Sequence, residues 1–447
     1  MSRLAWCLLG GCLAILAGVE LYGSFLSVSP VFRGGHVSNH SSESLETELL
    51  HLTRLNDICM AETEAIIPWT YNSPTIDRSL VYSKDMPLAT LLGQLAECPD
   101  VDVFLPNHLH GHGYCEDAMA YVKFLKARSL PLWVFDIVFN VDGTNQTYFD
   151  LCPKSAILFL NHYWDHLHER PTFPRNKTVI LMPNIEMYEL KAEHYNRADI
   201  VLAKTKDAYR RITSWYKQSN SIDKSSAVRF TQHTSSDPTV FLQPLPPKNF
   251  DKLTIFHAGG SSAHKNTPAI LDCWQSRPDF PTVHIYSKNK WYSEHLSVIP
   301  SNVDLNLGGE MSSVELGRKM AEASVILCPS AMEGFGHYIN QARASGALVV
   351  TTNGTPMNEF VDNATGVLID ATPRQQGGEV LMGENTEWNV EANAICAAVD
   401  KVLAMSPSER KAKARAGRLQ YEEQVHFFEN AMNQLRQHLK QQSLRLI

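Results

Sequence analysis

Short apolar runs alternate with helical patterns through the first half of the globular chain. The runs lie at residues 101–106, 131–139, 156–160, 178–182 and 200–203. They are nearly continuous rather than alternating with polar residues, which is typical of strands buried on both faces of a parallel sheet. Helical patterns at 116–127 and 207–216 separate several of them. This order predicts a doubly wound α/β sheet.

A second series of the same kind follows residues 243–248, which read Q-P-L-P-P-K. Three prolines in six residues exclude a helix interior or a central strand, so this segment is a predicted linker. The apolar runs beyond it lie at 253–257, 283–286, 303–307, 324–328, 347–352 and 366–369. We therefore expect two Rossmann-like α/β domains that face a cleft, with ligands at the C-terminal strand edges.

Helix signals in this half are local and clear. They are Thr267 as an N-cap before Pro268, Ser312 with Glu315, and Ser406 with Glu409. From 407 to 442 the only breaker is Gly417, which predicts one long helix or two abutting ones. The predicted boundaries are 49–242 for the first domain, 243–251 for the linker, 252–415 for the second domain and 416–447 for a C-terminal helix that packs back towards the first domain.

The N-terminus has a different composition. Arg3 precedes an uncharged segment at 4–19, and 21–28 is again mostly apolar, with Glu20 between them. The span is long enough to cross a hydrocarbon core of roughly 30 Å. A cleaved signal peptide and an uncleaved anchor at 1–28 both fit, and the combined length favours the anchor. Residues 29–48 then form a flexible stem, and the expected location is the Golgi or endoplasmic reticulum membrane, single-pass type II, with the globular part luminal.

Composition agrees with a secretory globular protein. The net charge is −7 with well-mixed signs, so no basic face for nucleic acid is expected. Asn-X-Ser/Thr sequons occur at Asn39, Asn145, Asn176, Asn353 and Asn363, of which Asn353 is expected to stay unmodified because it lies beside the candidate site. No C-x-x-C pair occurs among the cysteines, so a zinc site is not expected. One or two disulfides are expected among Cys59, Cys98, Cys115 and Cys152, with the pairing open.

One stretch, residues 329–346, joins two apolar runs and reads P-S-A-M-E-G-F-G-H-Y-I-N-Q-A-R-A-S-G. A strand that ends in a glycine turn and begins a helix directs backbone N–H groups to one point, which suits an anion or a polyhydroxylated ligand. Glu333 stands at the mouth of the turn, and Gln341 follows it by eight positions. The stretch is interpreted as half of a sugar-nucleotide site.

These residues carry a resemblance. Residues 253–369 resemble the donor-binding domain of retaining glycosyltransferases of family 4, which have two Rossmann-like domains in the GT-B arrangement. The signature of that family is E-G-F-G-x-x-x-x-E-A-x-A-x-G, and this chain has E-G-F-G-H-Y-I-N-Q-A-R-A-S-G, with Gln341 in place of the second Glu. The resemblance covers the C-terminal half by motif and the N-terminal half by architecture only.

The resemblance implies roles for the turn. Glu333 and the amides around Gly334, Phe335 and Gly336 would hold the donor sugar, and Gln341 would contact the ribose hydroxyls. An amide keeps one acceptor oxygen, so the exchange of Glu for Gln would weaken binding by about 1 kcal/mol rather than abolish it. The alternatives are a helix-dipole partner for Glu333 and a buried structural amide for Gln341.

A second motif, F-H-A-G-G-S-S-A-H-K-N at 256–266, ends a strand with Gly259 and Gly260 and includes Ser262 and Lys265. Such a loop can present amides and an ammonium to a diphosphate. The family has a Gly-Arg pair before its Lys; Lys265 matches the Lys, whereas Gly260 occupies the Arg position. Lys265 would then neutralise charge on the departing nucleoside diphosphate. An ordinary surface lysine is the alternative.

Weaker candidates lie in three loops. In N-G-T-P-M-N-E-F at 353–360, Glu359 matches an acid of the family's donor site, with helix capping as the alternative. In N-H-L-H-G-H-G at 107–113, His110 is the candidate for a catalytic contact to the donor sugar, and a metal is not favoured despite three histidines. In M-P-N-I-E-M-Y at 182–188, Asn184 and Glu186 are candidates for contact with the acceptor, with the N-cap of the following helix as the alternative role.

The sequence D-V-D at 100–102 has the form of a metal-binding Asp-X-Asp motif, but it precedes a predicted strand and is interpreted as a strand-start loop.

The predicted function is that of a membrane-anchored, luminal, retaining glycosyltransferase, a hexosyl- or pentosyltransferase. It would move sugar from a UDP- or GDP-sugar to a glycan or glycoprotein, with no metal and no cofactor besides the donor. The alternatives are a catalytically weak or inactive relative that acts as a binding or partner subunit, and a sugar-nucleotide hydrolase or epimerase of the same architecture.

Overall fold

The computed structural model describes residues 42–445 except 112, 220–226, 243, 290–298, 309–310, 375–380 and 383–386. Residues 46–447 form one compact unit, which contains the folded elements discussed below apart from the first turn of the first helix. The predicted anchor at 1–28 lies outside the described residues. No helix in the described part of the chain is both long and apolar enough to span a bilayer.

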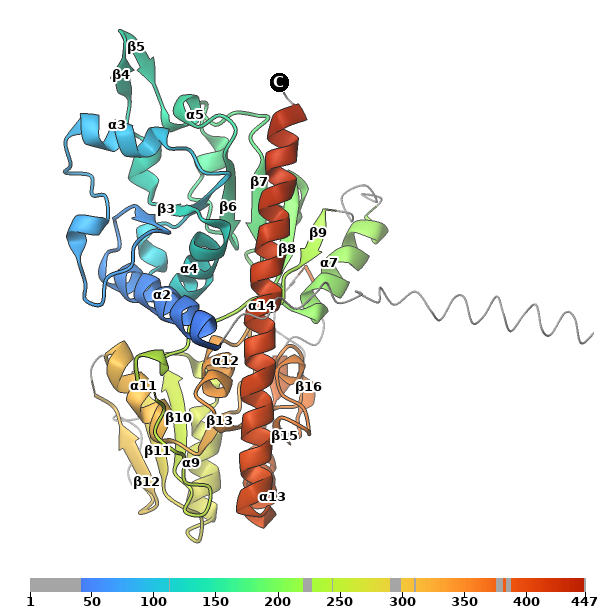
Figure 1. Cartoon of the computed structure of the whole chain (residues 1–447). Coiled ribbons are helices and arrows are strands. Elements are labelled where there is room, and N and C mark those ends of the chain that lie inside the picture. Colours follow the sequence, from blue (N-terminus) through green and yellow to red (C-terminus); the bar gives the residue numbers. More distant parts are fainter. Residues whose placement is uncertain are drawn as a thin grey trace, which may run out of the picture. The chain divides into compact units, whose positions relative to one another are not determined.

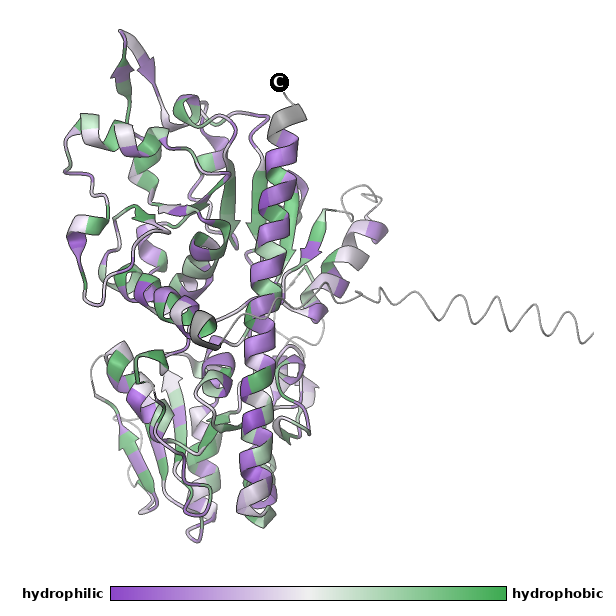
Figure 2. Cartoon of the chain, viewed as in Figure 1, coloured by the Kyte–Doolittle hydropathy of each residue, from purple (hydrophilic) through white to green (hydrophobic). Residues whose placement is uncertain are grey.

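In the described part of the chain, seven strands form the first sheet in the order β1-β3-β2-β6-β7-β8-β9 (Figure 1). Their bounds are β1 Ile67–Pro68, β2 Val101–Phe104, β3 Arg128–Leu130, β6 Ala156–Leu160, β7 Val179–Met182, β8 Ile200–Ala203 and β9 Val228–Phe230. All pairs are parallel except that of β1 with β3 at one edge. The residues of β6, β7 and β8 are buried and hydrophobic (Figure 2), as their apolar runs predicted.

Helices α2 (Ser42–Ala61), α3 (Leu88–Ala96), α4 (Tyr114–Leu125), α5 (Tyr148–Leu151), α6 (Ala192–Arg197) and α7 (Lys206–Gln218) accompany this sheet. The predicted strand at 131–139 is wrong. Residues Leu132–Phe135 form a 3-10 turn, and the strand lies just before them, at β3. Pro131 has no N–H to donate to a ladder, so the extended chain ends there. The following residues form a short hairpin, β4 (Phe139–Val141) with β5 (Thr144–Gln146), which the pattern did not predict.

The second sheet has six described strands, all parallel, in the order β12-β11-β10-β13-β14-β15. Their bounds are β10 Ile255–Gly260, β11 Val283–Ser287, β12 Val303–Asn306, β13 Val325–Cys328, β14 Leu348–Thr352 and β15 Gly366–Ile369. They coincide closely with the six predicted runs. The helices are α9 (Thr267–Ser276), α11 (Ser313–Glu322), α12 (His337–Ala344) and α13 (Ala392–Ala404), and β16 (Thr372–Arg374) pairs with β17 (Glu387–Asn389).

Two of the three predicted caps are present. Ser312 accepts from the amide of Glu315, and Ser406 and Glu409 bond each other's backbone amides. The third differs: the N-cap of α9 is Asn266 in a left-handed conformation, and Thr267 is the first helical residue. Its hydroxyl lies 2.9 Å from Nε2 of the buried His257, so it serves the strand-end loop instead of the cap.

The chain ends in a single helix, α14 (Pro407–Arg445), which decides the open alternative between one helix and two. Figure 1 shows it beside both sheets, and it packs on α4 of the first half and on α12, β14 and β15 of the second. Its buried face includes Tyr421, Val425, Phe428, Met432 and Leu435. Gly417 permits a close approach, because a Cβ there would lie 3.1 Å from the carbonyl oxygen of Thr365.

Three disulfides are formed among the described cysteines. Cys59–Cys115 and Cys98–Cys152 confirm the expected cross-links and settle their pairing. Cys273–Cys396 joins α9 to α13 and was not expected. Cys328 is free and buried.

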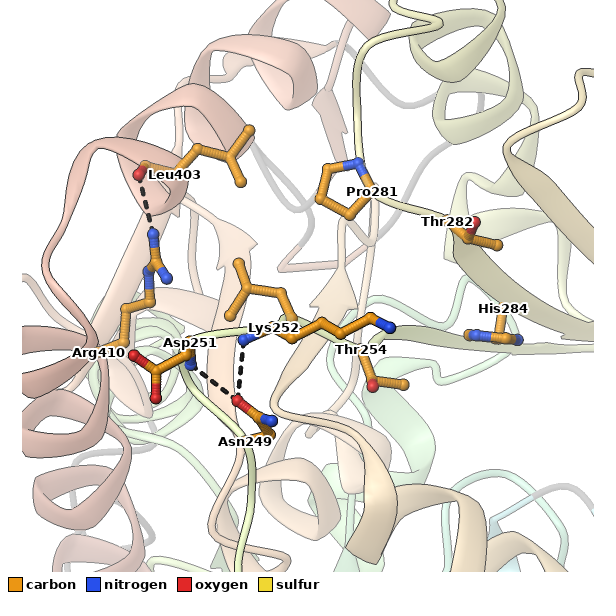
Figure 3. Close-up of a pocket in the computed structure, with 10 residues that line it drawn as sticks. Asn249, Asp251, Lys252, Thr254, Pro281, Thr282, His284, Leu403 and Arg410 are labelled. Atoms are coloured by element: carbon orange, nitrogen blue, oxygen red, sulfur yellow. Dashed lines mark hydrogen bonds between the residues drawn. The ribbon is translucent and has the colours of Figure 1, made fainter.

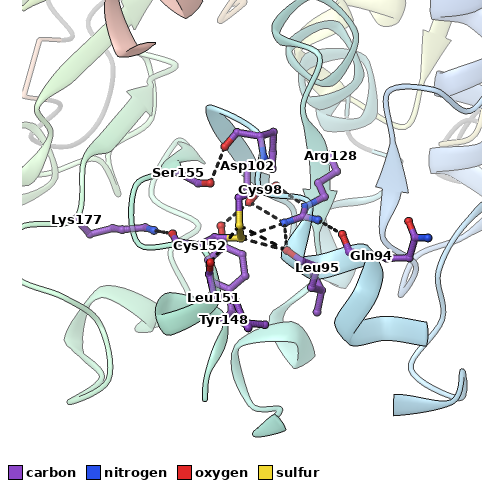
Figure 4. Close-up of a disulfide and its surroundings, with 11 residues drawn as sticks. Gln94, Leu95, Cys98, Asp102, Arg128, Tyr148, Leu151, Cys152, Ser155 and Lys177 are labelled. Carbon is purple, nitrogen blue, oxygen red and sulfur yellow. Dashed lines mark hydrogen bonds and ion pairs between the residues drawn. A yellow bond between two sulfur atoms is a disulfide. The ribbon is translucent and has the colours of Figure 1, made fainter. Parts of the chain in front are cut away.

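The D-V-D sequence has a structural role. Asp102 lies within β2 rather than before it, is fully buried, and accepts from Nε of Arg128 at 2.8 Å. The remaining guanidinium nitrogens donate to the carbonyl oxygens of Gln94 and Leu95 at 2.6 and 3.0 Å. The hydroxyl of Tyr148 also donates to Asp102, and the Cys98–Cys152 disulfide lies beside this group (Figure 4). Asp102 is therefore unable to face a ligand.

We expect Asp102→Ala to lower the free energy of unfolding by about 3–5 kcal/mol, because Arg128 would remain as a buried charge without its counter-ion. Urea denaturation of the variant measures this. The exposed Asp85→Ala is the control and should change stability little. A loss for Asp102→Ala as small as that of the control would contradict the assignment.

Candidate functional site

A cavity of about 570 Å³ lies where the loops after β10 and β13 meet loops and α4 from the first half of the chain. It brings together eleven of the residues predicted from sequence. They are Gly259, Gly260, Ser262, Lys265, Glu333, Gly334, Phe335, Gly336, Gln341, Asn184 and Glu186. The C-terminal edges of β10 and β13 in the second sheet thus contribute to the site, as expected for an open parallel sheet.

Lys265 and Glu333 form an ion pair in the lining of this cavity, although 68 positions separate them. Ser330 donates to the same Glu333 oxygen at 2.5 Å. Its only hydroxyl hydrogen is then used, so the Tyr338 hydroxyl, 2.6 Å away, donates to Ser330. The Lys265 ammonium also lies 3.6 Å from the centroid of the Tyr338 ring. The ammonium of Lys265 and the carboxylate of Glu333 are therefore held side by side, the first by the Tyr338 ring and the second by the Ser330 hydroxyl.

The glycine turn after Glu333 touches the loop that follows β7. A Cβ at Gly334 would overlap the Glu186 carboxylate and lie 2.5 Å from Cγ of Asn184. Gly336 has φ of +95° and is the N-cap of α12, a conformation that only glycine adopts readily. The backbone conformation thus favours glycine at position 336, whereas the close approach of the Asn184 and Glu186 side chains from the loop at 182–188 favours it at position 334.

Glu186 is a buried acid in this contact. Burial is the main cause that raises its pKa to about 7, and the neighbouring Glu333 and Asp117 carboxylates add to the shift, while Lys204 opposes it. Asn184 Oδ1 is buried and has no hydrogen-bond partner within the described ranges. The first half of the chain therefore places two polar groups against the turn, a carboxyl with a raised pKa and an amide oxygen without a hydrogen bond among the described residues.

A buried charged cluster that sequence reasoning missed lies behind the cavity. Both carboxylate oxygens of Asp117 in α4 lie 3.1 Å from Nζ of Lys204, which follows β8. Nε2 of His337 at the start of α12 lies 3.0 Å from the same carboxylate, and Nε2 of His233 lies 2.9 Å from it. Although burial opposes ionisation, Lys204 and the two imidazoles hold the pKa of Asp117 well below its usual range.

The cluster groups Asp117, His233 and His337 closely enough to suggest a metal. Lys204 already neutralises the carboxylate, however, and a divalent cation would stand next to its ammonium. The arrangement therefore suits an ion-pair network better than a metal centre. The expectation of a metal-free reaction stays a prediction. The one local signal of this cluster in the sequence was Lys204, a lysine directly after the fully apolar strand β8.

Gln341 is bound to the first half of the chain. Its Nε2 donates to Oε1 of Glu116 at 2.9 Å. Glu116 and Gln341 line both the central cavity and a neighbouring one of about 680 Å³, which extends between α2 and α11. Gln341 therefore stands at the junction of the two cavities.

Two predicted site residues lie elsewhere. His110 donates from Nδ1 to the carbonyl oxygen of Cys59 at 2.6 Å, beside the Cys59–Cys115 disulfide, and does not line the cavity. The contact of His110 with a donor sugar is therefore corrected, since the ring is turned towards the disulfide. Gly111 and Gly113 of the same loop do line the cavity.

Glu359 is the second correction. Its carboxylate accepts from the backbone amides of Lys206 and Asp207 at 2.7 and 2.8 Å, and it is not among the lining residues. These are the first two amides of α7, so the capping alternative describes this residue and the donor-ligand role does not. Thr205 satisfies the next amide, that of Ala208, through its side chain.

Another cavity, of about 740 Å³, lies at the opposite end of the second sheet (Figure 3). Its polar groups are engaged with their own backbone: Asn249 Oδ1 accepts from the amides of Asp251 and Lys252, and Arg410 donates to three carbonyl oxygens. This end carries the N-terminal ends of β10 and β11, where open α/β sheets do not bind ligands. It is not the candidate site.

Glu186→Gln should change how stability depends on pH. The native carboxyl binds its proton up to pH of about 7 and the unfolded one only to about 4.5, so its stabilising contribution is complete below pH 4.5 and lost as pH rises through 7. The variant lacks this loss, and its free energy of unfolding relative to the native protein should rise by roughly 3 kcal/mol between pH 4.5 and 8. Chemical denaturation across that range tests this, with the exposed Glu193→Gln as control. A difference that stays constant with pH would refute it.

Glu359→Ala should lower the free energy of unfolding by about 1–2 kcal/mol, the usual effect of removing a helix cap. The exposed Glu322→Ala, at the end of α11, is the matched control and should have little effect. Thermal and urea unfolding provide the measurement, and equal stability of the two variants would contradict the capping role.

No protein-family model and no curated protein sequence matches this chain. Among solved structures, a glycosyltransferase from Rickettsia africae ESF-5 is similar with a TM-score of 0.51 and 12% identity, over 77% of this chain and 99% of that one. Sucrose-phosphate synthase from Thermosynechococcus elongatus gives 0.46 and 16%, over 72% and 84%. Anabaena Alr3699/HepE, solved with UDP and glucose, gives 0.41 and 13%, over 80% and 81%. At such low identity the first likeness shows the fold: this chain has the GT-B glycosyltransferase fold, with two Rossmann-like sheets.

Proposed function

We propose that this protein is a retaining, metal-independent glycosyltransferase that moves a sugar from a UDP- or GDP-sugar to a glycan or glycoprotein. The observation that carries the proposal is the Lys265–Glu333 pair, which lies in a cavity beside the Gly259–Gly260 turn and the start of α12. A cation beside a glycine turn and a helix start suits a diphosphate, and a carboxylate next to that cation suits sugar hydroxyls.

The phosphate end of the donor would lie against the loop after β10. Gly260 has φ of +55°, and the backbone there is open to the cavity. Lys265 would exchange part of its contact with Glu333 for the diphosphate and neutralise the charge that develops as the sugar–phosphate bond breaks. Glu333, still bound by Ser330, would then accept from hydroxyls of the transferred sugar.

The acceptor would approach from the first half of the chain. Asn184 and Glu186 touch the Gly334 turn, and the near-neutral pKa of Glu186 suits a group that exchanges a proton with a hydroxyl. In a retaining reaction the departing phosphate can help to deprotonate the acceptor hydroxyl. The role proposed for Glu186 is therefore to position that hydroxyl through a hydrogen bond. The luminal location is proposed from the apolar N-terminal segment and is supported by the three described disulfides, which suit an oxidising compartment.

A binding or partner subunit is the second candidate, and Gly260 is the observation that favours it. The family has an arginine at this position, and this chain has glycine. The space beside it is open, because a Cβ on Gly260 would meet no atom within 4 Å. Position 260 therefore provides no cationic side chain to the site, which would reduce stabilisation of the leaving group.

Lys265→Ala and Glu333→Gln should each lower kcat about 100- to 1000-fold, the usual effect of removing one charged group that stabilises the transition state. The assay is transfer or hydrolysis with a panel of UDP- and GDP-sugars, using the full chain. The exposed Lys252→Ala, in the cavity at the far end of the sheet, is the matched control and should keep native activity. Absence of binding and turnover with every donor would refute the enzyme. If nucleotides bind without turnover, the partner-subunit candidate is favoured.

A further inference from the structure

We propose that Glu116 of α4 is a positioning residue that compensates for the missing carboxylate at position 341 by orienting the Gln341 amide. It holds the amide nitrogen of Gln341, so that Oε1 of Gln341 is the acceptor for a ribose hydroxyl of a nucleoside diphosphate. This inference rests on the proposed function and assigns one part of its site. No motif indicated Glu116, because its partner is 225 positions away.

The surroundings of Glu116 determine which way Gln341 faces. The carboxylate accepts from Asn56 Nδ2 at 2.7 Å and from the amide and hydroxyl of Ser236 at 2.9 and 2.6 Å. A carboxylate surrounded by donors can receive only the NH₂ side of the amide, which donates at 2.9 Å. The oxygen of Gln341 is thereby left for other contacts, and it has no hydrogen-bond partner among the described residues.

The same contact explains why glutamine occupies a position where the family has glutamate. Two carboxylates at this separation would repel each other, and one would have to keep a proton. Asp57 is a further acid nearby: burial raises its pKa, Glu116 raises it further, and a hydrogen bond from Ser313 opposes the shift. The exchange of Glu for Gln at position 341 is therefore matched to Glu116 and preserves one acceptor.

The position of Gln341 suits the middle of a nucleotide. The central cavity contains the phosphate loop with Lys265, and the neighbouring cavity of about 680 Å³ continues past Gln341 between α2 and α11. A diphosphate at the first and a base in the second would place the ribose at the junction. Glu116 fixes the amide there without itself contacting the ligand.

The test uses the full chain and isothermal titration with UDP, GDP and ADP, and with the 2′,3′-dideoxy analogue of the nucleotide that binds. The variants are Q341E, the exchanged pair E116Q/Q341E, and Gln341→Met, with the exposed Q437E of α14 as control. The charged and titratable groups that line the neighbouring cavity with Gln341 are Glu116, Asp57, Arg54 and Lys288; burial raises the pKa of Tyr421 in α14, and Glu116 raises it further. Those that line the central cavity with it include Asp117, Glu186, Lys204, Lys265, Glu333 and His337. Each affinity is therefore divided by that of the native protein at the same pH.

Relative to native protein, Q341E should weaken nucleotide binding roughly tenfold at pH 8 and much less at pH 5.5, where one proton can bridge the two carboxylates. E116Q/Q341E should recover most of the affinity at pH 8, because the amide and the carboxylate have exchanged places. Gln341→Met should lose roughly tenfold at both pH values, and the dideoxy analogue should bind the native protein roughly tenfold more weakly. Q437E should bind as the native protein does.

The inference is overturned if folded Q341E binds like the native protein at pH 8, if the exchanged pair is no better than Q341E, or if the dideoxy analogue binds as well as the nucleotide. Gln341→Met keeps it falsifiable should the exchanged pair fail to fold, since unchanged binding by that variant also overturns it. A native protein that binds none of the nucleotides refutes the proposed function, and this result is recognised without any variant.

Discussion

The buried carboxylate of Asp117 is the constraint on which the site depends. An isolated carboxylate in the interior would cost several kcal/mol, so its partners must be present for the two halves of the chain to pack. Lys204 supplies the opposite charge from the end of β8. His233 reaches the carboxylate from the crossing segment, residues 231–240 after β9, and His337 reaches it from the start of α12. These contacts hold residues from both halves of the chain together around Asp117. The Gly334 turn lines the same cavity as Asp117, Lys204 and His337.

The regular elements follow from local pattern, and the exceptions have local causes. The apolar run at 156–160 becomes β6 because both faces of that strand are covered. The run at 131–139 fails because Pro131 cannot donate a ladder hydrogen bond. The motif around Glu333 was placed correctly as a strand, turn and helix, since glycines and an N-terminal helix end are properties of neighbouring residues.

The direction in which a side chain points could not be predicted in the same way. Asp117 meets Lys204 across 87 positions and His337 across 220, and no periodicity connects residues at such distances. His110 was selected for its loop, but its ring faces the disulfide; Glu359 was selected for its motif, but it reaches the first amides of α7. In each case the loop was identified and the partner was supplied by tertiary packing.

Helix α14 has a consequence for biosynthesis. It packs on α4 and α12, and its Gln424 and Tyr421 bond the backbone oxygens of His233 and Ser235 in the crossing segment. A ribosome adds roughly 5–20 residues per second, so both sheets leave the exit tunnel well before this helix does. Until then the apolar surfaces that α14 covers are exposed, so the contacts that complete the fold form only after α14 has been synthesised.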